Sequence, residues 1–236
     1  MRIIIWNCNM AFRRKAKQIL TLKPNIIIVP ECESLEKLKF TDETLLPKDK
    51  FWFGEKANKG LGVFTYGNYS ISKNINHNKE YRFVVPLLID NEIDKFNLIA
   101  VWAQKPDTHN NYGIQVWNAI NYYSDLLKEE KLINAGDFNS NSIWDKPNRE
   151  ANHSNIVKLL NEKEILSTYH YYSKEEQGKE TKPTLFLQKK LNRKYHIDYC
   201  FASKTMINKL KNVAIGNHEN WIKYSDHAPL IVTFDD

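Results

Sequence analysis

The sequence contains no apolar run that approaches the roughly 20 residues needed for a membrane-spanning helix. It also contains no internal repeat, no low-complexity tract and no linker rich in glycine or proline. Its three cysteines show no CxxC spacing, which argues against a disulfide framework. The first ten residues have too short an apolar stretch for a signal peptide. We therefore expect a protein of the reducing cytoplasm with no membrane association.

The composition is that of an ordinary globular chain: 236 residues, of which 42% are hydrophobic, 12% aromatic and 26% charged. We expect one domain over residues 1–236. Lys and Arg number 34 against 28 Asp and Glu, so the net charge is +6. This excess suits an anionic partner such as nucleic acid, but a solvated lysine-rich surface explains it equally well.

Short β-branched runs and amphipathic stretches alternate along the chain. Strands are predicted over residues 2–6, 26–29, 51–54, 61–66, 81–90, 96–103, 132–135 and 229–234. Helices are predicted over residues 12–22, 112–128 and 150–162. Residues 183–187 are predicted to pair with 195–201 around a basic hairpin tip. This mixture favours α/β layers with much antiparallel sheet.

Polar residues interrupt the apolar strands at five places. The interruptions are Asn7-Cys8-Asn9, Glu31, Gly136-Asp137-Phe138-Asn139, Asp198 and Ser225-Asp226-His227. Catalytic side chains gather at strand ends and loops, where a rigid core presents them. Carboxylates can hold Mg²⁺ or activate water, and Asn and His can donate to phosphate oxygens. The pattern therefore predicts a metal-assisted phosphoester hydrolase.

In their order along the chain, these segments resemble the motifs of the endonuclease/exonuclease/phosphatase superfamily. The motif style is most similar to that of the exonuclease III-like apurinic/apyrimidinic endonucleases, which are DNase I-like. The resemblance extends from Trp6 to His227. It implies a four-layered α/β/β/α sandwich, in which two mixed, mostly antiparallel sheets pack face to face with helices outside. It also implies a Mg²⁺ cofactor, with Mn²⁺ as the alternative.

The resemblance implies a metal site and a water-activating group. Glu31 and Asp226 would hold the metal, and Asn9 would help to hold it through water. Pro30 stands where the family usually has Gln before the metal-binding glutamate. Asp137 would orient and activate the nucleophilic water.

The resemblance also implies how the phosphate is bound. Asn139 would help to position the water and the scissile phosphate, and Asn7 would contact phosphate or metal-bound water. His227 would donate to a phosphate oxygen. Asp198 would pair with His227 and fix its orientation, since a carboxylate sets the tautomer and direction of an imidazole.

The sequence departs from the family pattern after the strand at 96–101. Trp102 stands where the family commonly has His or Tyr, and an indole N–H can donate a hydrogen bond but cannot transfer a proton. Gln104 is a substitute phosphate donor by this alignment. Trp144, in the loop that follows Asn139, is expected either to stack on a base or sugar or to fold back onto the domain.

These motifs predict a Mg²⁺-dependent phosphodiester hydrolase, a nuclease with DNA as substrate, acting as a monomer without an obligate protein partner. The alternative is a phosphatase or phosphodiesterase for a small phosphorylated metabolite or lipid head group. A non-catalytic nucleic-acid-binding module is disfavoured, because it would gain from losing acidic residues that face its ligand. The basic clusters at 13–17 and 189–194 either follow a phosphate backbone or form a solvated face.

Overall fold

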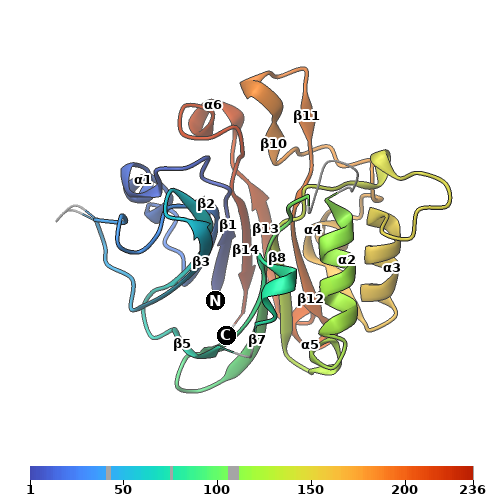
Figure 1. The fold of residues 1–236 in the computed structure, drawn as a ribbon, viewed down its shortest axis with the longest axis horizontal. Helices are drawn as coiled ribbons and strands as arrows, with labels where there is room; N and C mark the ends of the chain where they lie inside the picture. Colours follow the sequence, from blue (N-terminus) through green and yellow to red (C-terminus); the bar gives the residue numbers. More distant parts are fainter. Residues whose placement is uncertain (41–43, 75–76, 106–111, 236) are drawn as a thin grey trace.

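Two six-stranded sheets pack face to face in the computed structural model, which describes residues 1–40, 44–74, 77–105 and 112–235 (Figure 1). The first sheet has the order β13-β14-β1-β2-β4-β3 and comprises β1 (Arg2–Ile5), β2 (Ile26–Cys32), β3 (Asp49–Lys56), β4 (Lys59–Thr65), β13 (Leu210–Ile215) and β14 (Leu230–Phe234). The second has the order β5-β6-β7-β8-β12-β9 and comprises β5 (Ser70–Asn74), β6 (Val84–Asp90), β7 (Lys95–Trp102), β8 (Leu132–Asp137), β9 (Ile165–Ser167) and β12 (Asp198–Ser203). The pairs β1–β2 and β7–β8 are parallel and the others are antiparallel.

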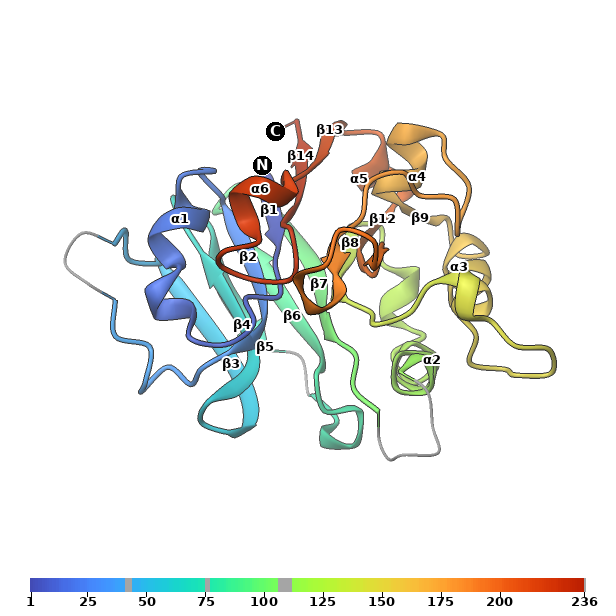
Figure 2. The same cartoon turned by 90° about the horizontal axis from the view of Figure 1, so that it is seen from above.

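Helices cover the outer faces of both sheets, as Figure 2 shows from above. The helices are α1 (Ala16–Leu20), α2 (Gly113–Tyr122), α3 (His153–Asn161), α4 (Thr168–Ser173), α5 (Lys204–Ile207) and α6 (His218–Trp221). Helix α1 packs on the first sheet, whereas α2 and α3 pack on the second. The predicted α/β/β/α layering is confirmed. Within the described residues, no helix is both long enough and apolar enough to cross a membrane.

The first two strands show why their apolar runs are continuous. Ile3 and Ile5 belong to the core between the sheets, whereas Ile4 packs on the helical side of the first sheet. On β2, Ile26 likewise lies between the sheets and Ile27 lies outside. Alternate side chains therefore enter two different cores, and both faces of these strands must be apolar.

The helices are shorter than the periodicity predicted. The predicted helix over 12–22 divides into a 3₁₀ turn, η1 (Phe12–Arg14), and α1, because Lys15 between them is not helical. The predicted helix over 112–128 ends at Tyr122, followed by the 3₁₀ turn η3 (Leu126–Lys128). The apolar spacing continues through both breaks, so periodicity alone does not reveal them.

The predicted pairing of 183–187 with 195–201 is only partly right. The short strands β10 (Leu185–Phe186) and β11 (Lys194–Tyr195) do form a hairpin. The following strand, β12, instead lies between β8 and β9 in the second sheet. Every residue of β12 is buried, and a central position in a covered sheet is what such a strand requires.

Gly136 allows β8 to approach β7 closely just before the strand ends. A Cβ at Gly136 would meet the backbone of Val101, and the residue has φ +153°. We expect Gly136→Ala to lower the free energy of unfolding by about 3 kcal/mol, because the clash is with backbone that cannot move aside. Gly67→Ala is the control, since Gly67 has φ +66° but no neighbour closer than 3.9 Å, and it should cost only about 1 kcal/mol. Urea unfolding midpoints measure both, and equal losses would contradict this account.

Candidate active site

The predicted site residues lie at one end of the sandwich. Strand β1 starts at the N label of Figure 1 and runs upward, so the polar residues that follow it lie at the upper end. The β10–β11 hairpin and α6 lie at the same end. The residues after β1 and β8, the last residues of β2 and the loop before β14 all lie at this end.

Asn7 connects carboxylates that belong to different sheets. Its Nδ2 donates to Asp137 Oδ2 at 2.9 Å, at the end of β8, and to Glu31 Oε1 at 3.4 Å, on β2. Its main-chain oxygen accepts from Ser225 Oγ at 2.7 Å, and the residue is buried. One amide side chain therefore joins a predicted metal ligand, Glu31, to the predicted water-activating carboxylate, Asp137.

Asp198 and His227 form a buried pair, as the resemblance implied. The distance from His227 Nδ1 to Asp198 Oδ2 is 2.8 Å. The main-chain nitrogen of His227 donates to Ser225 Oγ at 3.0 Å, and its carbonyl accepts from Trp6 Nε1 at 2.9 Å. The Asp198 contact orients the ring and directs Nε2 away from Asp198, and the other two contacts hold the His227 main chain.

The electrostatics of the buried cluster follow from its crowding. Asp137, Asp198 and His227 each have a potential ligand atom within 4.8 Å of the others. Burial, and then the charge of Asp198, raises the pKa of Asp137 well above its usual range. Burial by itself lowers the pKa of His227, but the charges of Asp198, Asp137 and Asp226 outweigh it and raise that pKa. The cluster can therefore hold a proton near neutral pH.

The carboxylates predicted to hold the cation lie next to Asn7 and Asn9. Glu31 lies at a bulge of β2, between Pro30 and Cys32, with φ +63°. Asp226 Oδ1 accepts from Asn9 Nδ2 at 3.2 Å, and the Asn9 main-chain nitrogen donates to Asn7 Oδ1 at 3.0 Å. Carboxylate and amide oxygens are the ligands of a hard cation such as Mg²⁺, so this set fits the implied metal.

Asn9 is held by an unusual loop. Residues 9, 10 and 11 all have positive φ, between 50° and 62°, which is costly for residues other than glycine. The buried carboxylate of Glu33 accepts from the main-chain nitrogens of Phe12 and Arg13 at 2.6 and 3.1 Å. Lys15 Nζ donates to the carbonyl of Asn9 at 3.1 Å. Part of the basic cluster at 13–17 therefore stabilises this loop, a role that composition did not reveal.

Asn139 follows Asp137 in a tight turn with φ +47°. Its main-chain nitrogen donates to Asp137 Oδ1 at 2.9 Å, and its Nδ2 donates to the Ala103 carbonyl at 3.1 Å. Asp137 thus accepts hydrogen bonds on both oxygens, from Asn7 and from Asn139.

A cavity of about 370 Å³ lies beside Asn139. Trp144 lines it, is 42% exposed and packs on Tyr195 with ring centres 4.9 Å apart. Lys105 and Arg149 contribute positive charge to the lining, and Leu185 contributes an apolar wall. Trp144 therefore lies near the site and packs on Tyr195, a contact that the sequence did not indicate.

Two predicted substrate-binding residues lie apart from this cavity. Trp102 is 3% exposed, pairs with Asp137 in the β7–β8 register and packs on Phe83 with ring centres 4.6 Å apart. Gln104 Nε2 donates to the Ala103 carbonyl at 3.2 Å, and its side chain lines a different cavity, next to Arg82. Direct phosphate contact by either residue stays a prediction.

Three residues that support the site were not predicted. Thr184 Oγ1 accepts from the main-chain nitrogens of Ile197 and Asp198, both at 3.0 Å. Ser225 joins Asn7 to His227 and was visible only as part of the S-D-H run. Lys59 Nζ lies 3.1 Å from Glu31 Oε1, and nothing in the sequence near Glu31 points to it.

A buried histidine, His153, lies in the wall of the cavity. Its Nδ1 is 2.9 Å from Ser140 Oγ and its Nε2 is 3.3 Å from Gln177 Oε1. Burial lowers the pKa of His153 to about 4 from 6.5. The neutral ring is therefore part of the folded state at neutral pH.

We expect His153 to make the fold less stable in acid. Because its folded pKa lies below its unfolded pKa, its contribution is complete above pH 6.5 and is lost as the pH falls toward 4. The loss should approach about 3 kcal/mol relative to His153→Gln. Urea unfolding of both proteins at pH 7.5, 6 and 4.5 measures it, and parallel pH profiles would contradict the assignment.

Comparison with known proteins identifies the fold. No protein-family model matches the sequence, and no curated protein matches it. Among solved structures, an AP endonuclease from Archaeoglobus fulgidus has a TM-score of 0.70 at 14% identity, with both chains covered in full. The 3'-5' exonuclease NExo from Neisseria meningitidis has a TM-score of 0.67 at 17% identity, again over the whole of both chains. A structure of the 3' phosphatase NExo from Neisseria, bound to a product DNA hairpin, has a TM-score of 0.70 at 14% identity, with both chains covered in full. The chain therefore has the DNase I-like fold, as the resemblance of its motifs implied.

Proposed function

We propose that this protein is a Mg²⁺-dependent phosphodiester hydrolase, with Mn²⁺ as the alternative cation, and that its substrate is DNA. One observation carries the proposal: Asn7 joins the carboxylates of Glu31 and Asp137 next to the buried Asp198–His227 pair. The similar solved structures are described as an AP endonuclease, a 3'-5' exonuclease and a 3' phosphatase with product DNA, which supports the reaction class.

Glu31 and Asp226 are the cation ligands in this proposal, with Asn9 holding Asp226 in place. When bound, the cation would neutralise charge on the phosphate and the leaving oxygen. Both carboxylates are only partly buried, so they are accessible from solvent. In the buried group of Asp137, Asp198 and His227, Nδ1 of His227 is already hydrogen-bonded to Asp198. We therefore assign this group of three residues to proton transfer and phosphate binding.

Asp137 acts on the water nucleophile. Its two oxygens accept from Asn7 and Asn139, which fixes the direction of the carboxylate. Its raised pKa makes it a stronger base than an exposed aspartate, as a general base near neutral pH requires. In this proposal Asn7 and Asn139 therefore orient the base.

His227 stabilises charge on the phosphate. Asp198 holds Nδ1 and favours the imidazolium form, so Nε2 carries a proton and positive charge. A fixed cationic donor is most effective when it is aimed at oxygens that gain charge in the transition state. Trp6 and Ser225 hold the main chain of His227, and Asp198 holds its ring.

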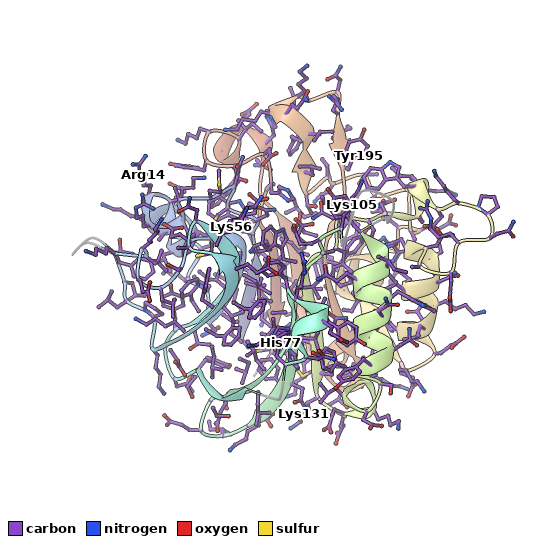
Figure 3. The ribbon with its side chains drawn as sticks, in the orientation of Figure 1. Arg14, Lys56, His77, Lys105, Lys131 and Tyr195 are labelled. Carbon is purple, nitrogen blue, oxygen red and sulfur yellow. The ribbon has the colours of Figure 1, made fainter. Side chains whose placement is uncertain are left out.

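Positive charge surrounds the site on separate elements. Figure 3 shows Arg14 on η1 and Lys105 after β7, both in the part of the molecule nearer the site. The tip of the β10–β11 hairpin adds Lys189, Lys190 and Arg193. A polyanion that crosses the site could contact several of these elements at once, which favours nucleic acid as substrate.

A small phosphorylated metabolite is the second candidate substrate. The cavity beside Asn139 has a volume of about 370 Å³ and two cationic residues, Lys105 and Arg149. This size falls within the range of small-ligand sites. If DNA is the substrate, the same cavity with Trp144 would hold a nucleotide next to the scissile phosphate.

We expect Asp137→Asn to reduce kcat for DNA cleavage about a thousandfold, because the water loses its base. His227→Gln should reduce it about a hundredfold or more, because a charged phosphate donor is removed. Asp125→Asn is the matched control, since Asp125 is exposed and pairs only with Lys128 at 2.6 Å among the described contacts. Chelation of divalent cations should abolish cleavage by every variant. Full activity of pure Asp137→Asn protein would contradict the proposed mechanism.

We expect the hairpin tip to contribute to the salt dependence of DNA binding. The double variant Lys189→Ala/Lys190→Ala should reduce the slope of log Kd against log salt by about 2, because two phosphate contacts are removed. The control Lys131→Ala/Lys204→Ala removes the same charge near the opposite end of the molecule, where Figure 3 labels Lys131 and Figure 1 labels α5, which begins at Lys204. Fluorescence anisotropy with labelled duplex DNA, in the Asp137→Asn background, measures both slopes. Equal slopes for the two double variants would show that the hairpin is ordinary surface.

A further inference from the structure

Lys59 lies between a predicted metal ligand and an aromatic ring. It begins β4, and its Nζ is 3.1 Å from Glu31 Oε1 and 5.2 Å from the centre of the Trp102 ring. The side chain of Lys59 is 41% exposed and that of Glu31 is 18% exposed. The ammonium group is therefore at the open surface of the site, held by an anion on one side and a π-face on the other.

The hairpin that carries Lys59 is tied to the bulge that carries Glu31. Trp52 on β3 lies over Gly54 and Gly60, where its ring leaves no room for a Cβ. Trp52 Nε1 donates to the carbonyl of Cys32, the residue after Glu31, at 3.0 Å. The pairing of β4 with β2 and the contacts of Trp52 thus position Lys59 next to Glu31.

Stability does not account for this ion pair. A partly exposed pair of this kind contributes about 0–1 kcal/mol. Glu31 is also a proposed ligand of the divalent cation, and a cation at Glu31 would repel the ammonium group. If a cation took the place of Lys59 at Glu31, the ammonium group would keep its position over the Trp102 ring and would have N–H donors for another anion.

We propose that Lys59 is a ligand of the substrate phosphate, presented on the face of Trp102 and held by Glu31 until the divalent cation binds. The inference rests on the proposed function, because it takes Glu31 as a cation ligand and a phosphoester as substrate. It also explains the presence of Trp102, since the indole supports the cationic donor and needs no proton-transfer chemistry of its own.

The proposal predicts two effects of opposite sign when the charge is removed. Lys59→Met keeps an aliphatic side chain on Trp102 but loses the ammonium group. DNA binding at saturating Mg²⁺ should weaken about tenfold, the size of one lost charged hydrogen bond. Mg²⁺ binding without DNA should tighten about fivefold, because a positive charge next to Glu31 is gone. A purely structural role would not improve cation binding.

The test uses Lys59→Met, Lys59→Arg and the control Lys56→Met, each in the Asp137→Asn background. Lys56 faces Lys59 in the same hairpin and is exposed, and among the described contacts only Lys59 forms an ion pair with Glu31, so the Lys56 variant carries the same charge change without losing that pair. Isothermal titration calorimetry with Mg²⁺ and anisotropy with a labelled DNA hairpin give the two affinities. We expect Lys59→Arg to restore DNA binding to within about threefold of the Asp137→Asn parent and Lys56→Met to change either affinity less than twofold.

Two results would overturn the proposal: DNA binding by Lys59→Met that equals that of Lys56→Met, or Mg²⁺ binding that weakens or stays unchanged. A wild-type protein that cleaves no nucleic acid would instead overturn the proposed function. The two failures are distinguishable, because both binding measurements use a catalytically disabled background and need no turnover.

Discussion

The amide of Asn7 is the contact on which the rest of the site depends. It comes from the end of β1 in one sheet and donates to Asp137, which ends β8 in the other. The same nitrogen reaches Glu31 at 3.4 Å. Buried carboxylates repel one another and lose hydration, so each needs such partners to be tolerated in the folded state. The sandwich therefore does more than display the site, because the spacing of its sheets sets the spacing of the carboxylates.

The layering and the position of the site could be predicted from local pattern. Runs such as Ile3-Ile4-Ile5 are apolar at successive positions, which indicates a strand covered on both faces. The polar residues that stop these strands, Asn7 and Asp137 among them, then had to lie at strand ends. Pairing of Asp198 with His227 followed from the resemblance, and the structure brings the two side chains to 2.8 Å.

Contacts between distant segments could not be predicted in this way. The non-helical Lys15 interrupts a regular apolar spacing, because its side chain bonds to the carbonyl of Asn9 in the preceding loop. Glu33 accepts a hydrogen bond from the main-chain nitrogen of Phe12 at the end of that loop, although Glu33 follows β2 and lies 21 residues after Phe12 in the chain. Lys59 reaches Glu31 only because β4 pairs with β2, a register that no local pattern records. In the sequence alone, each of these charged residues is indistinguishable from an ordinary surface residue.

At one end of the sandwich, the carboxylates that we propose as cation ligands lie among basic residues of several elements. This arrangement suits an anionic polymer that supplies one phosphate to the acidic centre and its neighbours to the basic residues. The most direct measurement is a side-by-side hydrolysis assay of plasmid DNA, abasic-site duplex, single-stranded DNA, RNA and a bis-aryl phosphodiester, with Mg²⁺ or with EDTA. The account predicts Mg²⁺-dependent cleavage of DNA that Asp137→Asn protein lacks. Turnover of the small diester alone, or of nothing, would contradict it.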